Sequence, residues 1–169
     1  MIKYNKDYFL KDCGGCERYQ QSKGKLLNDI LQFTINISDL LPTHKVLDIG
    51  CGRGELIFHS ALKGCEVVGI DVSSDAIEIS YETISQLPET LRKNVKLMQK
   101  SACEIDFADN FFDRIFLTDV VEHLTDEELK KVFNICRRLL RDDGKVIIHT
   151  APTLNYLKIG QYIRKLFYC

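Results

Sequence analysis

The sequence lacks the features that direct a chain to a membrane or to nucleic acid. No apolar run approaches the length of a membrane span, and residues 1–7 lack the apolar core of a secretory signal peptide. Lys and Arg form no run long enough to attract nucleic acid, and the formal net charge is −1. We therefore expect a cytoplasmic protein that binds neither nucleic acid nor membrane.

The cysteines do not form the pattern of a disulfide framework or of a zinc site. Their number, seven, is odd, and most stand singly in a chain without a secretory signal, so reduced thiols are expected. Cys13 and Cys16 have the spacing of zinc ligands, but no second pair follows them. We expect no metal site, and the pair is interpreted as a glycine turn with two incidental thiols.

Composition and hydrophobic spacing predict one soluble α/β domain. Of the 169 residues, 45% are hydrophobic and 28% are charged, as in an ordinary globular protein. Apolar runs typical of buried strands are found at 45–49, 66–71, 95–98, from 112 onward and at 145–149. Helical spacing is found at 22–40, 55–62, 74–87, 126–141 and 154–167, with Ser73 and Thr125 as expected N-caps. The helix over 22–40 should pack on the sheet through Leu26, Leu27, Ile30, Leu31, Phe33, Thr34 and Ile37.

The strongest functional signal is the segment 46–55, Val-Leu-Asp-Ile-Gly-Cys-Gly-Arg-Gly-Glu. An apolar run followed by alternate glycines predicts a buried parallel strand that turns tightly into a helix. Such a turn brings backbone N–H groups against a nucleotide-like ligand, and a Cβ there would fill the space that the ligand needs. The spacing is G-x-G-x-G, whereas a dinucleotide site has G-x-G-x-x-G. Asp48 would repel a pyrophosphate but suits a ligand with an ammonium and a sulfonium.

This turn resembles motif I of the class I S-adenosylmethionine-dependent methyltransferases, in particular the methyltransferase type 11 group that includes quinone-biosynthesis enzymes. Segments 66–73, 112–124 and 139–148 resemble later motifs of the same family, in the same order. The last of them has Asp142-Asp143 where the family usually has Pro-Gly. Together the four matches extend over residues 46–152, which makes an incidental glycine turn a poor explanation.

The resemblance implies a Rossmann-like three-layer α/β sandwich with a mostly parallel sheet in the order 3-2-1-4-5. Residues 1–44 would form an N-terminal cap segment and a helix, in which an aromatic stretch folds over the cofactor or the substrate mouth. Residues 45–169 would form the cofactor-binding core. The C-terminal strands 6 and 7 of the family are missing from this chain, so we expect either a fragment or a homodimer that covers the open sheet edge.

The resemblance also implies a cofactor, S-adenosylmethionine, with S-adenosylhomocysteine as its product. Asp71 would take the ribose hydroxyls, Val72 would lie against adenine, and Asp119 would hold the ammonium group. Ser101-Ala102 stands where the family usually has Asp-Ala, so the bond from the adenine amino group lacks charge assistance. The expected cofactor contacts are Asp48, Gly50, Cys51, Gly52, Gly54, Asp71, Val72, Ser101, Ala102, Cys103, Thr118 and Asp119.

His123 and Glu122 are the expected catalytic residues, because they follow the fourth strand at the end of the sheet where an acceptor should arrive. The pair could instead tie this loop to the next helix. The main hypothesis is methyl transfer from S-adenosylmethionine to a small-molecule acceptor. The alternative, suggested by Ser101 and the missing strands, is a non-catalytic binding or assembly domain; the glycine spacing disfavours a nicotinamide-dependent reductase.

Overall fold

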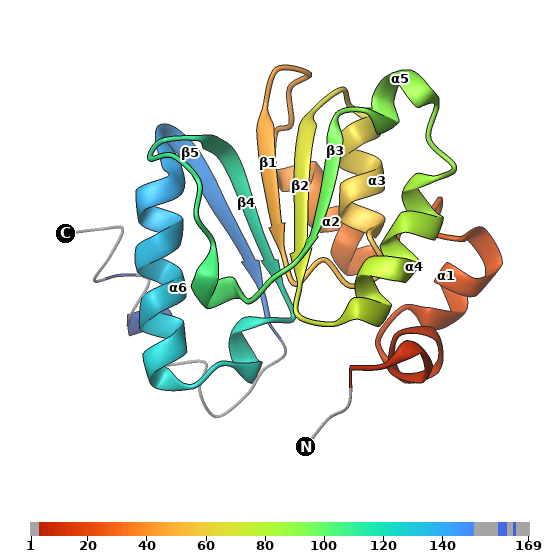
Figure 1. Ribbon diagram of the computed structural model, residues 1–169, viewed down its shortest axis with the longest axis horizontal. Helices are drawn as coiled ribbons and strands as arrows, with labels where there is room; N and C mark the ends of the chain where they lie inside the picture. The colour runs from red at the N-terminus through yellow and green to blue at the C-terminus, as the bar shows by residue number, and fades with distance from the viewer. Residues whose placement is uncertain (1–3, 151–158, 162–163, 165–169) are drawn as a thin grey trace.

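Five parallel strands form the centre of the protein (Figure 1). The computed structural model describes residues 4–150, 159–161 and 164. The three inner strands are buried along most of their length on both faces, as a parallel sheet covered by helices on both sides requires. The strands are β1 (Lys45–Ile49), β2 (Glu66–Asp71), β3 (Val95–Gln99), β4 (Phe112–Thr118) and β5 (Leu140–His149). Their order is β3-β2-β1-β4-β5, so the predicted topology is confirmed.

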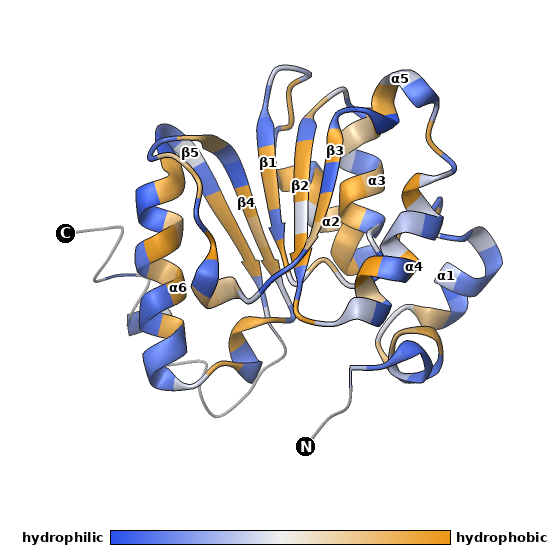
Figure 2. Ribbon diagram, viewed as in Figure 1, coloured by the Kyte–Doolittle hydropathy of each residue, from blue (hydrophilic) through white to orange (hydrophobic). Residues whose placement is uncertain are grey.

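Helices cover the two faces of this sheet (Figures 1 and 2). One apolar cluster joins the sheet to α2 (Asp29–Ile37), α3 (Glu55–Leu62) and α4 (Ser74–Ile84), and another joins it to α6 (Asp126–Leu139). The side chains of β1 alternate between the two, since Val46 belongs to the first cluster and Leu47 and Ile49 to the second. The shorter helices are η1 (Tyr8–Asp12), α1 (Cys16–Ser22), α5 (Glu89–Arg92), η2 (Ala102–Glu104) and η3 (Val121–His123).

Both predicted N-caps are present. The Ser73 hydroxyl accepts from the Ala76 amide at 3.2 Å at the start of α4. At the start of α6, Thr125 and Glu128 form a reciprocal capping box, in which the Glu128 carboxylate accepts from the Thr125 amide at 2.9 Å. These caps fix where each helix begins, and so they fix the length of the loops that follow β2 and β4.

The helix predicted over 22–40 is wrong in its bounds. The chain forms α1, then a break, then α2, because Lys23 and Gly24 both take left-handed backbone conformations with φ of 53° and 87°. A Cβ on Gly24 would lie 2.7 Å from the Thr83 side chain, so the break also permits close packing against α4. Asn28 then caps α2 by accepting from the Leu31 amide at 2.9 Å.

The face of α2 that meets the core also differs from the prediction. Ile35 and Thr34 are buried there, together with Leu27 just before the helix. The predicted residues do have helical spacing, but some of them form an apolar stripe that is exposed to solvent. The exposed members of that stripe are Leu26, Ile30, Phe33 and Ile37, with exposed fractions of 60%, 41%, 64% and 43%.

Other element ends also differ from the sequence prediction. Helix α4 ends at Ile84 and the short α5 follows Pro88, whereas a single helix to residue 87 was expected. Strand β5 begins at Leu140, which pairs with Phe112 across an irregular step in register before the regular ladder starts at Lys145. The helix predicted over 154–167 lies largely outside the described residues.

Within the described residues, β5 is an edge strand, and homodimer formation through this edge stays a prediction. None of the helices described is long and apolar enough to cross a membrane.

Gly54 provides a test of how closely α3 packs on α4. Its φ is +79°, and a Cβ there would lie 2.9 Å from the Ser80 hydroxyl and 3.1 Å from the Ser80 backbone. We expect Gly54→Ala to lower the free energy of unfolding in urea by about 1–3 kcal/mol, since it adds both strain and crowding. Gly14→Ala is the matched control, because a Cβ at Gly14 meets nothing within 4 Å. Equal losses for the two variants would contradict this account.

Candidate functional site

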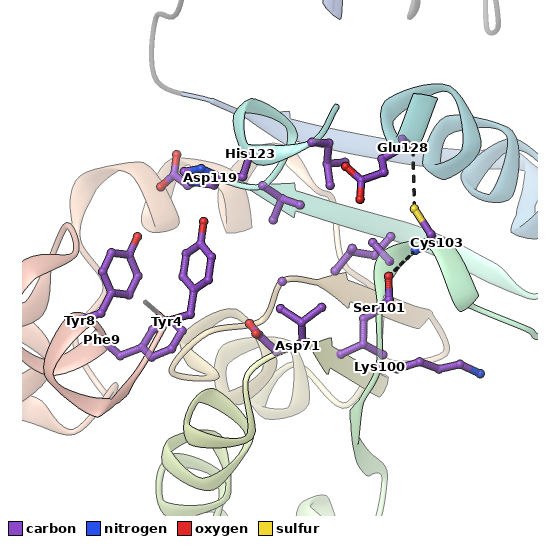
Figure 3. A pocket seen from close by; sticks show the side chains of 17 residues that line it. Tyr4, Tyr8, Phe9, Asp71, Lys100, Ser101, Cys103, Asp119, His123 and Glu128 are labelled. Atoms are coloured by element: carbon purple, nitrogen blue, oxygen red, sulfur yellow. Dashed lines mark hydrogen bonds between the residues drawn. The ribbon is translucent and has the colours of Figure 1, made fainter. Parts of the chain in front are cut away.

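Two adjoining cavities lie at the carboxyl ends of the parallel strands, where ligands bind in open α/β sheets. The first has a volume of about 240 Å³ and extends from the ends of β1 and β2 to the loop after β3 (Figure 3). The second, of about 380 Å³, extends from the glycine turn to the ends of β4 and β5. The two share a rim formed by Tyr8, Phe9, Gly50, Asp119 and His123.

The glycine turn is held against the end of β2 by its own backbone. The amides of Gly50 and Cys51 both donate to the Ile70 carbonyl, at 2.8 and 2.9 Å. Gly50 has a φ of +72°, and a Cβ there would lie 2.3 Å from the Val120 side chain. The ends of β1 and β4 therefore approach each other as closely as they do only because this residue has no side chain.

Asp71, at the end of β2, faces the first cavity (Figure 3). Its carboxylate oxygens accept from the Gly52 amide at 3.0 Å and from the Ser73 amide at 2.9 Å. Burial raises the pKa of Asp71, while these amides act in the opposite direction. Each oxygen retains a lone pair, so the fixed carboxylate can accept from two neighbouring hydroxyl groups of a ligand. Val72 beside it is 57% exposed, an apolar side chain open to a flat ligand.

The opposite wall of the first cavity comes from the loop after β3. Ser101, Ala102 and Cys103, which are expected cofactor contacts, all line it. The Ser101 hydroxyl accepts from the Cys103 amide at 3.2 Å, so it caps the short helix η2 and keeps its own proton free to donate. Figure 3 shows Ser101 and Cys103 on the side of the cavity near α6.

Asp48 lines the second cavity and carries a buried carboxyl group. Burial raises its pKa to about 7, and the nearby Asp71 and Glu55 carboxylates add to this rise. The buried Thr118 hydroxyl in the same cavity has no hydrogen-bond partner among the described residues. A ligand ammonium group would donate to this hydroxyl and place a positive charge beside Asp48, so these residues fit a cationic amino acid moiety.

The ends of β4 and β5 bring acids and histidines together on the outer side of the second cavity. Asp119, with a φ of +55°, places its carboxylate 2.7 Å from Nδ1 of His149. Glu122 accepts from the Thr150 hydroxyl at 3.0 Å. His123 packs edge-on against the Tyr4 ring, with 5.8 Å between ring centroids. The expected catalytic pair therefore borders the rim between the two cavities, within a polar cluster.

Aromatic residues of the N-terminal segment lie along this rim. Tyr8 and Phe9 line both cavities, and Tyr4 lines the first. Their rings meet edge to face, at 5.2 Å for Tyr4 and Tyr8 and at 5.1 Å for Tyr8 and Phe9. We call residues 4–22 the aromatic cap.

All but one of the predicted site residues line one cavity or the other. The exception is Gly54, which lines neither and instead allows α3 to pack on Ser80. The residues placed in the first cavity are Gly50, Asp71, Val72, Ser101, Ala102, Cys103, Asp119 and His123. Those placed in the second are Asp48, Gly50, Cys51, Gly52, Thr118, Asp119, Glu122 and His123.

Sequence reasoning missed the residues that reach the site from distant elements. These include Arg53 and His149 in the second cavity, together with Asn28 and Ile30 near α2. Arg53 stands within the glycine motif, but no neighbouring residue in the sequence indicates that its side chain turns toward the N-terminal segment. The His149 side chain is bound by the Asp119 carboxylate and also faces the cavity.

Comparison with known proteins identifies the family. The sequence model described as a methyltransferase domain matches residues 46–144. Cyclopropane-fatty-acyl-phospholipid synthase from Escherichia coli (strain K12) is 30% identical over 99% of this chain and 40% of its own length. Phosphoethanolamine N-methyltransferase 2 from Caenorhabditis elegans is 34% identical over 70% of this chain and 26% of its own length. The chain thus spans 40% or less of these two relatives.

The fold agrees with solved structures of the same kind. Phosphoethanolamine N-methyltransferase 1 from Haemonchus contortus, solved with phosphoethanolamine and S-adenosylhomocysteine, aligns with a TM-score of 0.71 at 20% identity, over 87% of this chain and 30% of that one. The chain belongs to the methyltransferase domain family, and more specifically to the class I S-adenosylmethionine-dependent methyltransferases. The cofactor of this family is S-adenosylmethionine.

The raised pKa of Asp48 predicts how stability depends on pH. The ordinary pKa of Asp is about 3.9 and the folded value is about 7, so the folded state binds more protons between these limits. Stability from this group is therefore complete below pH 4 and is lost as the pH rises through 7. We expect Asp48→Asn to remove that loss, and to be more stable than the unmodified protein at pH 8.5 by about 2 kcal/mol in urea unfolding.

Asp113→Asn is the control, because the pKa of Asp113 is shifted in the opposite direction from that of Asp48. Although burial raises the pKa of Asp113, the Lys45 amide and Arg141 outweigh it and lower that pKa. Asp113 is thus ionised in the folded state at both pH 5 and pH 8.5, and its substitution should reduce stability equally at both. A gain for Asp48→Asn that is the same at pH 5 and pH 8.5 would show that the Asp48 charge is not its cause.

Proposed function

We propose that this chain binds S-adenosylmethionine across the two cavities and transfers its methyl group to a small-molecule acceptor. The observation that carries the proposal is the placement of Asp71 and Asp48 on either side of one glycine turn, each facing a different cavity. A nucleoside with an amino acid attached has its hydroxyl and ammonium groups at opposite ends. One ligand of this kind can satisfy both carboxylates at once.

The chain's residues divide the binding between them. Asp71 would accept from the ribose hydroxyls, Val72 would cover the adenine face, and Ser101 to Cys103 would border the adenine edge. Asp48, Thr118 and Asp119 would hold the ammonium group. When bound, the cofactor supplies an activated methyl group, so the protein needs chiefly to place the acceptor in line with it.

Glu122 and His123 are proposed to hold or remove a proton of the acceptor. Both line the second cavity, together with Asp119 and Tyr8. The Glu122 carboxylate is held by the Thr150 hydroxyl, which leaves its second oxygen available to an acceptor. Support for a small acceptor comes from relatives such as phosphoethanolamine N-methyltransferase 2 of C. elegans and the ubiquinone biosynthesis O-methyltransferase of Pseudomonas putida.

The second candidate is a non-catalytic binding or assembly domain with the same fold. Ser101 favours it, because a hydroxyl already engaged with the Cys103 amide holds an adenine amino group less strongly than a carboxylate would. The two proposals differ in turnover rather than in fold.

We also propose a cytoplasmic location, because the described cysteines Cys13, Cys16, Cys51, Cys65, Cys103 and Cys136 are all free thiols. We further propose that the protein self-associates through the edge of β5. Sedimentation velocity over a range of protein concentrations tests this self-association, and a monomer at every concentration would contradict it.

Calorimetric titration with S-adenosylhomocysteine tests cofactor binding. We expect one site, and we expect Asp71→Ala to weaken it by at least about tenfold through loss of both ribose contacts. Glu66→Ala is the matched control, since Glu66 is an exposed acid at the far end of the same strand. Loss of binding in both variants, or in neither, would argue against the proposed role of Asp71.

Substitution of the proposed base tests turnover. With an acceptor in hand, Glu122→Gln and His123→Asn should each lower kcat by about 10²–10⁴-fold if that side chain moves the proton. The dissociation constant for S-adenosylhomocysteine should change less than about threefold in either variant. Unchanged kcat in both would leave these residues a structural role only, and no turnover by the unmodified chain with any acceptor would favour the assembly domain.

A further inference from the structure

Arg53 lies inside the glycine turn, yet its side chain reaches away from the sheet to the aromatic cap. It is 5% exposed, which is rare for an arginine. Its Nε donates to the Glu55 carboxylate at 2.9 Å. Its Nη1 donates to the Phe9 carbonyl and its Nη2 to the Gly14 carbonyl, each at 2.9 Å.

Two more contacts complete the surroundings of the guanidinium group. Nη1 is 2.8 Å from the Cys13 sulfur, and the carbon of the guanidinium lies 5.1 Å from the centre of the Tyr19 ring. Each of the three guanidinium nitrogens therefore has a partner, and four of the five contacting residues belong to the aromatic cap, namely Phe9, Cys13, Gly14 and Tyr19. A planar fork of donors suits this task, whereas the single ammonium of a lysine does not.

The backbone of Arg53 is joined to the same segment by a second route. Its carbonyl accepts from the Thr83 hydroxyl at 2.7 Å, and Thr83 in turn lies 2.8 Å from the Tyr19 hydroxyl. The glycine turn, α4 and the cap thus meet at one buried polar cluster. A buried charge in such a cluster is costly when any partner is removed, so the arrangement has one preferred geometry.

This cluster determines where the aromatic rings lie over the cavities. Phe9, whose carbonyl is bound by Arg53, has its ring 3.7 Å from the position that a Cβ of Gly52 would take. Tyr8 is its neighbour, and both residues form the shared rim of the two cavities. Arg53 thereby links the turn that would contact the ligand to the residues that cover it.

We propose that Arg53 is a positioning residue that holds the aromatic cap closed over the cofactor, so that cofactor affinity and residence time depend on it. This rests on the proposed function, because it assumes that the cavities hold S-adenosylmethionine. Arg53 acts through Tyr8 and Phe9 rather than by contact with reacting atoms.

A double-mutant cycle on S-adenosylhomocysteine binding tests the proposal. Tyr8→Ala alone and Arg53→Lys alone should each weaken binding by about tenfold and speed dissociation. In the Arg53→Lys background, Tyr8→Ala should cost less than about twofold, because the ring has already lost its position. Arg138→Lys is the matched control, since that arginine also binds a carbonyl and a carboxylate, Phe107 and Asp109, but lies far from the cap. Multiplicative losses in the double variant would overturn the proposal.

Hydrogen exchange of the ligand-free protein gives a second, independent measurement. Arg53→Met should raise the exchange rates of the amides of Cys13, Cys16 and Tyr19 at least about tenfold, and leave those of α6 unchanged. Unchanged exchange in the cap would overturn the proposal even if affinity falls. If the unmodified protein does not bind S-adenosylhomocysteine but Arg53→Met still frees the cap, the proposed function fails while the structural role of Arg53 stands. Should Arg53→Met not fold, Arg53→Lys takes its place.

Discussion

The glycine turn is fixed to the end of β2 by three amide hydrogen bonds, and the site takes its shape from them. Two go to the Ile70 carbonyl and one to the Asp71 carboxylate. They place the backbone of the turn, the Asp71 carboxylate and the mouth of the second cavity in a single rigid unit. Because the acceptor at Asp71 is itself a proposed ligand group, the turn and its ligand are positioned by the same side chain.

That arrangement concentrates negative charge in the interior. Asp48, Asp71 and Glu55 lie near one another, and the buried Arg53 pairs with Glu55. The two remaining carboxylates have no cation beside them among the described residues. Binding sites commonly keep such unfavourable groupings because the ligand relieves them, and a substitution that stabilises the empty protein then weakens the complex. Asp48 is the clearest instance, since its carboxyl is buried and the Asp71 and Glu55 carboxylates act against its ionisation.

Much of the core was predictable from sequence, and the reasons are local. Strands β1 and β2 are short apolar runs that each contain or end in an acid, and the glycine spacing between β1 and α3 leaves few alternatives to a tight turn. The caps at Ser73 and Thr125 were found because a capping side chain acts within three residues of its own position. The residues expected at the cofactor site belong to motifs at strand ends. The sheet order determines which of these strand ends lie next to each other.

The cap region was less predictable, for equally physical reasons. Its position depends on Arg53, which contacts residues about forty positions away, and no periodicity in the sequence reports such a contact. The extent of α2 was misjudged because Gly24 interrupts a pattern that otherwise continues through it. The choice of buried face was right for Leu27, Leu31 and Thr34 but wrong for an apolar stripe, Leu26, Ile30, Phe33 and Ile37, that does not meet the core.

The sheet order has a further consequence for how the chain acquires its structure. The central strand β1 pairs with β2 about twenty residues later, but its other edge pairs with β4, so that Val46 meets Arg114. During synthesis, one edge of β1 therefore stays unpaired until the residues of β4 have been translated. Gly50 can close against Val120 only then. Contacts of such long sequence separation form slowly, so the ligand site is among the last parts of the molecule to be completed during folding.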